Sequence, residues 1–371
     1  MSTVALTADS LLEKHGNGQM ARNLVAALLR LPPAHDTCWR FLPYQDRPID
    51  AVLAALQPDA ARVDIAPLPP KTRTRFRNLL TPLAGRYPLD GVNVLHALRP
   101  SETLKLARRC PQIVTLLDLG NPLARGRAWL LNKASLRAMV RHADLVITIS
   151  EATRRHALER LALDPAQVTA VPLGIADDYY LPVPDEAVTA VRQHYHLPAD
   201  YLLAAGHITP HKNLPRLLAA YRSLHDRYPD LPPLVLIGGS AAGLLTPGDA
   251  ESGLIRTPGY VPQAHLPALM RGARYLVFPS LFEGFGLPAL EAQAVGTPPL
   301  VSDLPVFHET LQDTVLFFDP YQVESIANTL ATALNDPALR DDLSRRGLTN
   351  SARFRWEVAA AAYLDAYRRF A

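Results

Sequence analysis

Residues 280–298 read SLFEGFGLPALEAQAVGTP and place two glutamates on either side of a Gly-Phe-Gly-Leu-Pro turn. The apolar run RYLVFPS (274–280) leads into the turn and predicts a buried strand, and ALEAQAVG (289–296) after it predicts a helix. The two glycines of the turn allow backbone angles that other residues avoid, and Pro288 suits the first turn of a helix. The stretch therefore predicts a strand, a tight turn and a helix whose amino end is open to a ligand.

The two acids indicate what that ligand is. Free N–H groups at a helix amino end attract an anion, most naturally a phosphate. Glu283 follows the strand at its carboxyl end, where ligands bind in an open α/β sheet, and Glu291 lies one turn inside the helix. Because carboxylates repel phosphate, this pair fits neutral hydroxyl groups on either side of it, a sugar and a ribose. The pattern predicts a site for a nucleotide-sugar.

The same letters leave two alternatives open. GFGLPA fits the dinucleotide fingerprint G-x-G-x-x-A, and Asp303 follows the next expected strand, where a ribose-binding acid would stand. An NAD-dependent oxidoreductase is therefore one alternative, although LFE intervenes between the strand and the first glycine and the motif comes late in its domain. The other alternative is that both glutamates are ordinary solvated charges.

Composition describes a globular protein of more than one domain. The chain has 371 residues, 48% of them hydrophobic and 20% charged, and a length of this kind predicts two domains. A net charge of +3 does not call for nucleic acid. Cys38 and Cys110 fit reduced thiols, the first residues lack a signal-peptide pattern, and no apolar run is long enough for a membrane helix. We expect a cytoplasmic protein.

Short apolar runs alternate with stretches of helical period, which predicts an α/β fold of parallel sheets covered by helices. The runs that predict strands are STVALT, VNVLHA, PQIVTLLD, ADLVITIS, QVTAVPL, YLLAAG, PLVLIGG, RYLVFPS and PPLVSD. We expect one Rossmann-like domain over residues 1–173, a proline-rich acidic linker over 174–198 and a second Rossmann-like domain over 199–350. Residues 351–371 predict a final amphipathic helix in which Trp356, Tyr363 and Tyr367 pack.

The stretch FPSLFEGFGLPALEAQAVGTPPLVSDLPVFHE resembles the signature of family-4 retaining glycosyltransferases, in which seven residues separate two glutamates. LLAAGHITPHKNLPRLLAA, GYVPQAHLPAL and LFFDPYQVESIA resemble other blocks of that family's C-terminal half, and HGNGQMARNL, TLLDLGNP, ITISEATRRHAL and TAVPLGIADDYY resemble its N-terminal half more loosely. The resemblance implies a GT-B fold, with two facing Rossmann-like domains and a last helix that crosses back to the first.

The resemblance also implies roles for individual residues. Glu283 would hold the donor sugar's hydroxyls, Glu291 the ribose, and Lys212 would neutralise the departing diphosphate. Asn213 is expected to cap the helix that follows Lys212. The remaining donor-site residues implied by the family are Gly16, Gly18, Gly206, His207, His211, Gly259, Tyr260, Val261, Gly284, Phe285, Gly286 and Leu287. We expect no metal and no cofactor, because the chain has no Asp-x-Asp pair and Lys212 with backbone amides can stabilise the leaving group.

This chain departs from the family pattern at several places. His207 and His211 stand where an arginine often accompanies the lysine, and Leu117 stands where many relatives have a histidine. Asp118 remains after Leu117 and is a candidate catalytic residue that orients the acceptor hydroxyl or the sugar. Candidate acceptor contacts are His96, Asp118, Ser150 and Glu151, with a core role as the alternative for His96.

Residues 71–88, KTRTRFRNLLTPLAGRYP, gather positive charge in the expected acceptor domain. Lys71, Arg73, Arg75 and Arg77 could contact anionic headgroups at the cytoplasmic membrane face, or the phosphate of an acceptor. A solvated loop is the alternative.

The whole pattern favours a retaining, metal-independent glycosyltransferase of bacterial surface polysaccharide assembly. We expect it to move a hexose, of mannose or rhamnose type, from a nucleoside-diphosphate sugar, with GDP favoured, to a saccharide or lipid-linked acceptor. A protein that binds the nucleotide-sugar without transferring it is a further alternative.

Overall fold

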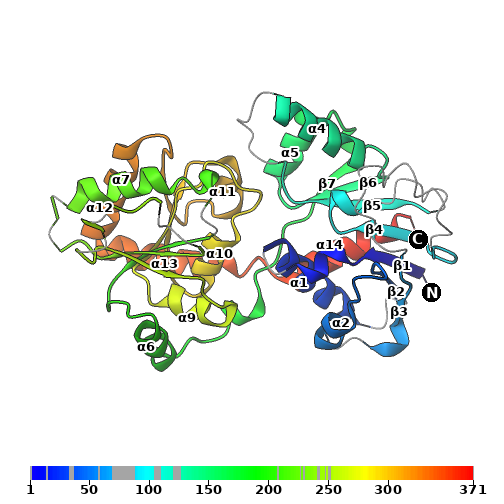
Figure 1. Cartoon of the computed structure of the whole chain (residues 1–371), viewed down its shortest axis with the longest axis horizontal. Helices are drawn as coiled ribbons and strands as arrows, with labels where there is room; N and C mark the ends of the chain where they lie inside the picture. Colours follow the sequence, from blue (N-terminus) through cyan, green and yellow to red (C-terminus); the bar gives the residue numbers. More distant parts are fainter. Residues whose placement is uncertain are drawn as a thin grey trace. The chain divides into compact units, whose positions relative to one another are not determined.

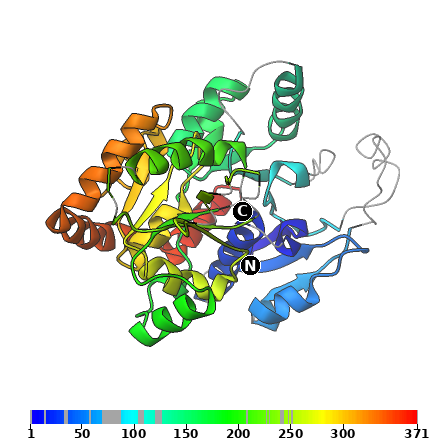
Figure 2. The same ribbon diagram turned by 60° about the vertical axis from the view of Figure 1, so that its left-hand side comes forward.

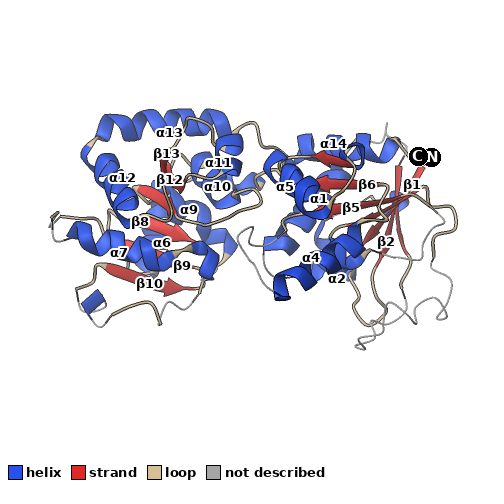
Figure 3. Ribbon diagram, turned by 90° about the horizontal axis from the view of Figure 1, so that it is seen from above, coloured by secondary structure: helices blue, strands red, loops and turns tan. Residues whose placement is uncertain are grey.

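The structure is a computed structural model that describes residues 2–13, 16–32, 37–56, 59–68, 88–103, 110–119, 127–206, 209–225, 227–228, 230–239, 243–246, 248–249 and 252–370. The chain forms two compact units, one made of residues 1–174 with 354–371 and the other of residues 175–353. In each unit helices surround a parallel sheet, and both chain ends lie in the first unit (Figures 1 and 3).

Within the described residues, the first unit holds a sheet of seven parallel strands in the order β3-β2-β1-β4-β5-β6-β7. The strands are β1 (Ser2–Thr7), β2 (Thr37–Leu42), β3 (Val63–Ile65), β4 (Val94–Ala97), β5 (Gln112–Leu116), β6 (Leu145–Thr148) and β7 (Val168–Ala170). Every residue of β4, β5 and β6 is buried. These strands are nearly continuous apolar runs because helices cover both faces of the sheet.

The helices of the first unit come from both ends of the chain. They are α1 (Gly16–Arg30), α2 (Asp50–Leu56), α4 (Arg127–Val140), α5 (Glu151–Leu161) and α14 (Trp356–Arg368). The last helix, α14, packs beside α1 (Figure 1). As the sequence predicts, Trp356, Tyr363 and Tyr367 are buried, and the Tyr367 ring meets the Trp39 ring edge-on at 6.2 Å between centroids.

The second unit repeats the plan with six described strands in the order β10-β9-β8-β11-β12-β13, all parallel. The strands are β8 (Leu202–Ala205), β9 (Leu234–Ile237), β10 (Ile255–Gly259), β11 (Tyr275–Phe278), β12 (Pro299–Ser302) and β13 (Leu316–Phe318). The helices are α6 (Asp185–His194), α7 (Leu214–His225), α9 (Leu266–Arg271), α10 (Leu287–Ala294), α11 (Pro305–Thr310), α12 (Val323–Asn335) and α13 (Pro337–Ser351).

Most of the stretch that the sequence predicts as a linker (174–198) falls within the second unit. Residues 175–198 belong to that unit and contain α6, which packs on α9. Val191 of α6 is buried. Because prolines and acidic residues surround this short helix in the sequence, composition alone predicted a linker and not a helix.

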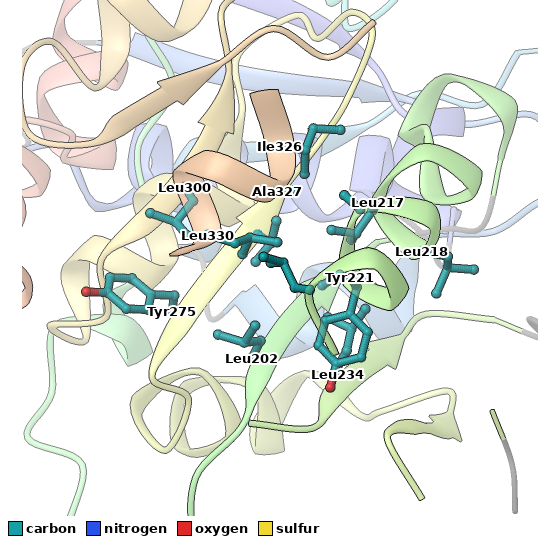
Figure 4. Close-up of a cluster of buried hydrophobic side chains, with 14 of the residues drawn as sticks. Leu202, Leu217, Leu218, Tyr221, Leu234, Tyr275, Leu300, Ile326, Ala327 and Leu330 are labelled. Carbon is teal, nitrogen blue, oxygen red and sulfur yellow. The ribbon is translucent and has the colours of Figure 1, made fainter. Parts of the chain in front are cut away.

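The core of the second unit lies between the sheet and two helices. Figure 4 shows strand residues Leu202, Leu234, Tyr275 and Leu300 facing side chains from α7 and α12. Buried side chains on the helices include Leu217, Leu218, Tyr221, Ile326, Ala327 and Leu330. Two buried tyrosines in this cluster keep their hydroxyls satisfied: Tyr221 donates to the carbonyl of Pro232 (2.9 Å) and Tyr275 to that of Ala333 (2.8 Å).

Each sheet reverses its direction of winding at one place. In the first sheet β1 and β4 are neighbours, and the following strands are added outward on each side, β2 next to β1 and β5 next to β4. In the second sheet β8 and β11 are the corresponding neighbours. At such a switch point the connections leave on opposite faces and a crevice opens at the carboxyl ends of the strands, which is where open α/β sheets bind ligands. Figure 2 shows the second sheet and its helices from another side. The β8–β11 border is therefore the place to look for a site.

Leu217→Ala tests the core assignment. Leu217 is 0% exposed, so truncation leaves a cavity and should lower the free energy of unfolding by about 2–5 kcal/mol. Leu181→Ala is the matched control, because Leu181 is 62% exposed and its loss should change stability by less than about 0.5 kcal/mol. Denaturant unfolding of both variants gives the two values, and equal values would contradict the assignment.

Candidate functional site

An ion pair joins the loops that follow β8 and β11. Lys212 Nζ lies 2.6 Å from Glu283 Oε1, and the two side chains are 15% and 14% exposed. The Lys212 ammonium also lies over the Phe278 ring at the end of β11, 4.5 Å from the ring centroid. The structure thus brings together the two residues that the sequence places at the chemistry, and it brings them to the switch point of the second sheet.

Two glycines allow the loops to come this close. The Lys212 side chain runs past Gly206, at the end of β8, with its Nζ 3.6 Å from the position a Cβ would take there. Gly238, at the end of β9, has φ +108° and lies so close to Gly206 that a Cβ would collide with the Gly206 carbonyl. Both positions favour glycine for their backbone, since Gly206 has φ +132° and Gly238 has φ +108°, and Gly238 also has no room for a side chain.

The predicted turn and helix after Glu283 are present. Gly286 has φ +93° and precedes α10, and Pro288 lies in the first turn. A Cβ on Gly286 would collide with the Phe307 ring, which itself lies 5.7 Å from the Phe278 ring. At the start of α10, Pro288 has no N–H, and the amides of Ala289 and Leu290 donate to the Gly286 carbonyl (3.0 and 3.4 Å). The amide of Leu287 is therefore the one at this helix start that can meet a ligand.

Glu291 lies inside α10, half-buried, and its carboxylate accepts a hydrogen bond from the hydroxyl of Tyr179. Burial raises the pKa of Glu291 to about 7, and the Tyr179 hydrogen bond lowers it in part. Gln263 Nε2 donates to the Tyr179 hydroxyl at 3.1 Å. The sequence did not single out Tyr179 or Gln263. Tyr179 falls in the TAVPLGIADDYY block and Gln263 in the GYVPQAHLPAL block, and both blocks resemble the family, but neither residue stands out within its block.

His211 ties the two loops together. Its carbonyl accepts from the amide of Leu281 (2.8 Å), its Nδ1 lies 3.0 Å from Thr209 Oγ1, and its ring lies 4.7 Å from that of Phe282. His207 lies outside the described residues, as do Lys71, Arg73, Arg75 and Arg77.

The expected cap at Asn213 takes another form. Asn213 has φ +56°, and its carbonyl accepts from the amides of Arg216 and Leu217 at the start of α7. Its side chain does not cap the helix. Instead Nδ2 donates to the carbonyl of Pro320 (2.7 Å) and Oδ1 accepts from the Arg216 guanidinium (2.9 Å). Asn213 therefore joins the β8 loop to the loop after β13.

Gly259, Tyr260 and Val261 lie where β10 ends, at the same carboxyl edge. Gly259 has φ +84° and its carbonyl accepts from the amide of Gly238 (3.0 Å). Tyr260 is 73% exposed and Val261 is buried. The exposed ring of Tyr260, at the carboxyl edge of the sheet, could stack on a planar group of a ligand.

The GFGLPA turn is not a dinucleotide fingerprint. That fingerprint follows the first strand of its domain, and the first strand of this sheet is β8, whereas the turn follows β11.

The remaining candidates lie in the first unit. Gly16 and Gly18, which the resemblance implies as donor contacts, lie in the first turn of α1. A Cβ on Gly18 would collide with the Glu13 carbonyl, so the turn needs glycine there. Asp118 is exposed just beyond β5, and Leu117 is half-buried beside it.

Ser150 and Glu151 lie where β6 passes into α5. Ser150 is buried and caps α5, accepting from the amide of Thr153 (3.0 Å), so its side chain has a structural task. Glu151 is exposed on the first turn and forms an ion pair with Arg154 (3.4 Å).

His96 lies in the core of the first unit. It is 0% exposed, with Nδ1 2.8 Å from the Tyr367 hydroxyl and Nε2 2.8 Å from Thr115 Oγ1. Tyr363 lies 3.1 Å from the same Thr115 oxygen. Burial lowers the pKa of His96 to about 3, so the ring is neutral. Both ring nitrogens are used within the protein, which favours the core role for His96 over acceptor contact.

A buried charged cluster at the switch point of the first sheet was not predicted. Arg99 reaches Asp9 (3.2 Å), Glu102 (2.9 Å) and Glu13, and Arg47 also pairs with Asp9. Burial raises the pKa of Glu102, whereas hydrogen bonds from Ser10 and Thr7 lower it. These contacts fix the loop that leads from β1 into α1. Because Asp9 and Arg99 are far apart in the sequence, no local sequence pattern predicts that they form a cluster.

Two features are absent from the described part of the chain. No three His, Cys, Asp or Glu side chains come together there as metal ligands would. No helix there is both long enough and apolar enough to cross a membrane.

Comparison with known proteins identifies the family. The pattern of the group 1 glycosyl transferases matches residues 193–349, and that of glycosyltransferase family 4 matches residues 16–179. A D-inositol 3-phosphate glycosyltransferase from Jonesia denitrificans is 30% identical over 77% of this chain and 69% of its own. The chain belongs to the family-4 glycosyltransferases.

Other relatives are named as mannosyltransferases. O-antigen chain mannosyltransferase B from Escherichia coli is 30% identical over 63% of this chain. The matched part spans 63% of that relative and 33% of the Escherichia coli mannosyltransferase WbdA. Among solved structures, HepE from Anabaena in complex with UDP and glucose matches with a TM-score of 0.75 at 15% identity and covers 100% of both chains. The fold is therefore GT-B.

Gly286→Ala tests the turn before α10. The added methyl group would meet the Phe307 ring from a backbone angle that alanine rarely adopts, so the free energy of unfolding should fall by about 1–3 kcal/mol. Gly243→Ala is the control in the same unit, because nothing lies within 4 Å of its added Cβ and its φ is not positive. Equal unfolding midpoints for the two variants would show that the turn tolerates a side chain.

Proposed function

We propose that this family-4 glycosyltransferase moves a hexose from a nucleoside-diphosphate sugar to a saccharide or lipid-linked acceptor, without a metal and with retention of anomeric configuration. The observation that carries the proposal is the pair of Lys212 and Glu283 at the switch point of the second sheet, next to the start of α10 and with Glu291 farther along that helix.

The charges of this site suit the donor. An ammonium has three N–H donors, so Lys212 can keep Glu283 in place while it also contacts a diphosphate oxygen. Glu283, an acceptor when ionised, is suited to the sugar's hydroxyls, and Glu291 to those of the ribose. As the nucleoside diphosphate leaves, negative charge grows on its terminal oxygen, where Lys212 and the Leu287 amide at the start of α10 would stabilise it. This division of roles needs no metal.

Retention follows from the resemblance rather than from a visible nucleophile. In the step that we propose, the bond between the anomeric carbon and the phosphate oxygen breaks while the acceptor oxygen attacks the same face. The acceptor's proton passes to the departing phosphate oxygen, so charge and atoms balance. Asp118, exposed beyond β5, would orient the acceptor hydroxyl or the sugar.

The donor sugar and the setting are inferred from relatives. The mannosyltransferase relatives favour mannose as the sugar, and the O-antigen name of one of them favours bacterial surface polysaccharide assembly. Rhamnose as a related sugar, GDP as the carrier and a place on the cytoplasmic side of the membrane are proposed from the family resemblance. Contact of Lys71, Arg73, Arg75 and Arg77 with anionic headgroups remains part of the proposal. A thermal-shift screen over GDP-, UDP-, dTDP- and ADP-sugars tests the carrier, because tight donor binding raises the melting temperature.

Substitutions at the ion pair test the chemistry. Lys212→Ala should lower kcat by about 100- to 1,000-fold, because the departing charge loses its cation. Glu283→Gln should lower kcat/KM by a similar order, about 100-fold, by weakening the grip on the sugar. Released nucleoside diphosphate and labelled product are both measured.

Glu324→Gln is the control for these variants, because Glu324 is exposed on α12 in the same unit. Unchanged transfer by Lys212→Ala or by Glu283→Gln would contradict the proposal. Tight donor binding without any release of nucleoside diphosphate would instead favour a binding protein that lacks transfer.

A further inference from the structure

A buried tyrosine supports the second glutamate of the site. Tyr179 is 1% exposed and ends the short 3-10 turn Asp177–Tyr179, far along the chain from α10. Its hydroxyl contacts Glu291 on one side and Gln263 on the other.

The direction of the hydrogen bonds follows from the donors available. The Gln263 Nε2 group can only donate, so the Tyr179 oxygen accepts from it at 3.1 Å. A phenol has one proton, and with its oxygen already accepting from Gln263 that proton points to Glu291. A hydrogen bond donated to a carboxylate favours the ionised form, which opposes the effect of burial.

The ionised form is the one that a ribose requires. An ionised carboxylate accepts hydrogen bonds on both oxygens, whereas a protonated one loses part of that capacity. We propose that Tyr179, oriented by Gln263, is a positioning residue that directs its proton to Glu291 and so holds that side chain as an acceptor for the donor's ribose hydroxyls. The inference rests on the proposed function, because it takes Glu291 as the ribose contact.

Other charges around Glu291 do not supply this effect. α10 packs against α9, α13, β11 and β12, and among the described residues no charge on these elements shifts Glu291. Asp178, next to Tyr179, acts on the tyrosine and disfavours loss of its proton. Burial raises the pKa of Glu291 to about 7 with the Tyr179 hydrogen bond in place, so loss of that hydrogen bond would move the pKa of Glu291 higher.

The test measures affinity against pH. Affinities for GDP and for UDP are determined by titration calorimetry between about pH 6 and about pH 9, on the full chain. If Tyr179→Phe raises the pKa of Glu291 by about one unit, affinity should fall about fivefold near pH 7 and return to within about twofold of wild type near pH 9. Gln263→Leu, an exposed position, should shift the curve in the same direction by less.

The neighbouring residue provides a matched control. Tyr180→Phe removes a hydroxyl that donates to the Ser351 carbonyl (2.8 Å), and its curve should follow the wild type. Glu291→Gln should weaken binding and flatten the pH dependence, because an amide does not titrate. If Tyr179→Phe does not fold, as judged by its melting temperature, Gln263→Leu carries the test.

Two failures remain distinguishable. If neither nucleotide binds the wild type, or Glu291→Gln binds as well as wild type, the donor site itself is wrong. If Glu291→Gln weakens binding while the Tyr179→Phe curve runs parallel to wild type at every pH, with or without a constant loss, the positioning role of Tyr179 is overturned and the donor site stands.

Discussion

The site depends on one contact, the ion pair between Lys212 and Glu283. A parallel sheet delivers both residues to one edge, and the reversal of winding between β8 and β11 leaves room above that edge. Around the pair, two positive-φ glycines have a steric reason, because a Cβ on Gly238 would collide with the Gly206 carbonyl and a Cβ on Gly286 with the Phe307 ring. The ammonium lies over the Phe278 ring, which in turn contacts the ring of Phe307.

Much of this could be predicted from the sequence because it is local. STVALT and RYLVFPS are strands since continuous apolar runs mark strands buried on both faces, and the Gly-Phe-Gly-Leu-Pro turn defines the start of α10. The edge strand β10, IRTPG, could not be found in this way. Its exposed polar residues and its proline are tolerated because it borders the sheet on one side.

What sequence could not supply were the partners that meet across long separations. Arg99 and Asp9 belong to one buried cluster although Asp9 follows β1 and Arg99 follows β4. Tyr179 and Glu291 are far apart in the sequence, and only the folded chain brings them into contact. For His96 the sequence left both acceptor contact and a core role open, and the hydrogen bond to Tyr367 favours the core role. Polar residues carry no periodic signal, so only the packing reveals which of them bind ligands and which hold the protein together.

The helix α14 has a consequence for how the protein is made. It completes the first unit, yet the ribosome produces it after the entire second unit. Until then the nascent first sheet lacks the aromatic cover that Tyr363 and Tyr367 give to His96 and Trp39. Contacts that span so much chain form slowly. During translation the second unit can therefore complete its fold before the first unit does. Until α14 is made, part of the apolar surface of the first unit stays exposed and can bind chaperones.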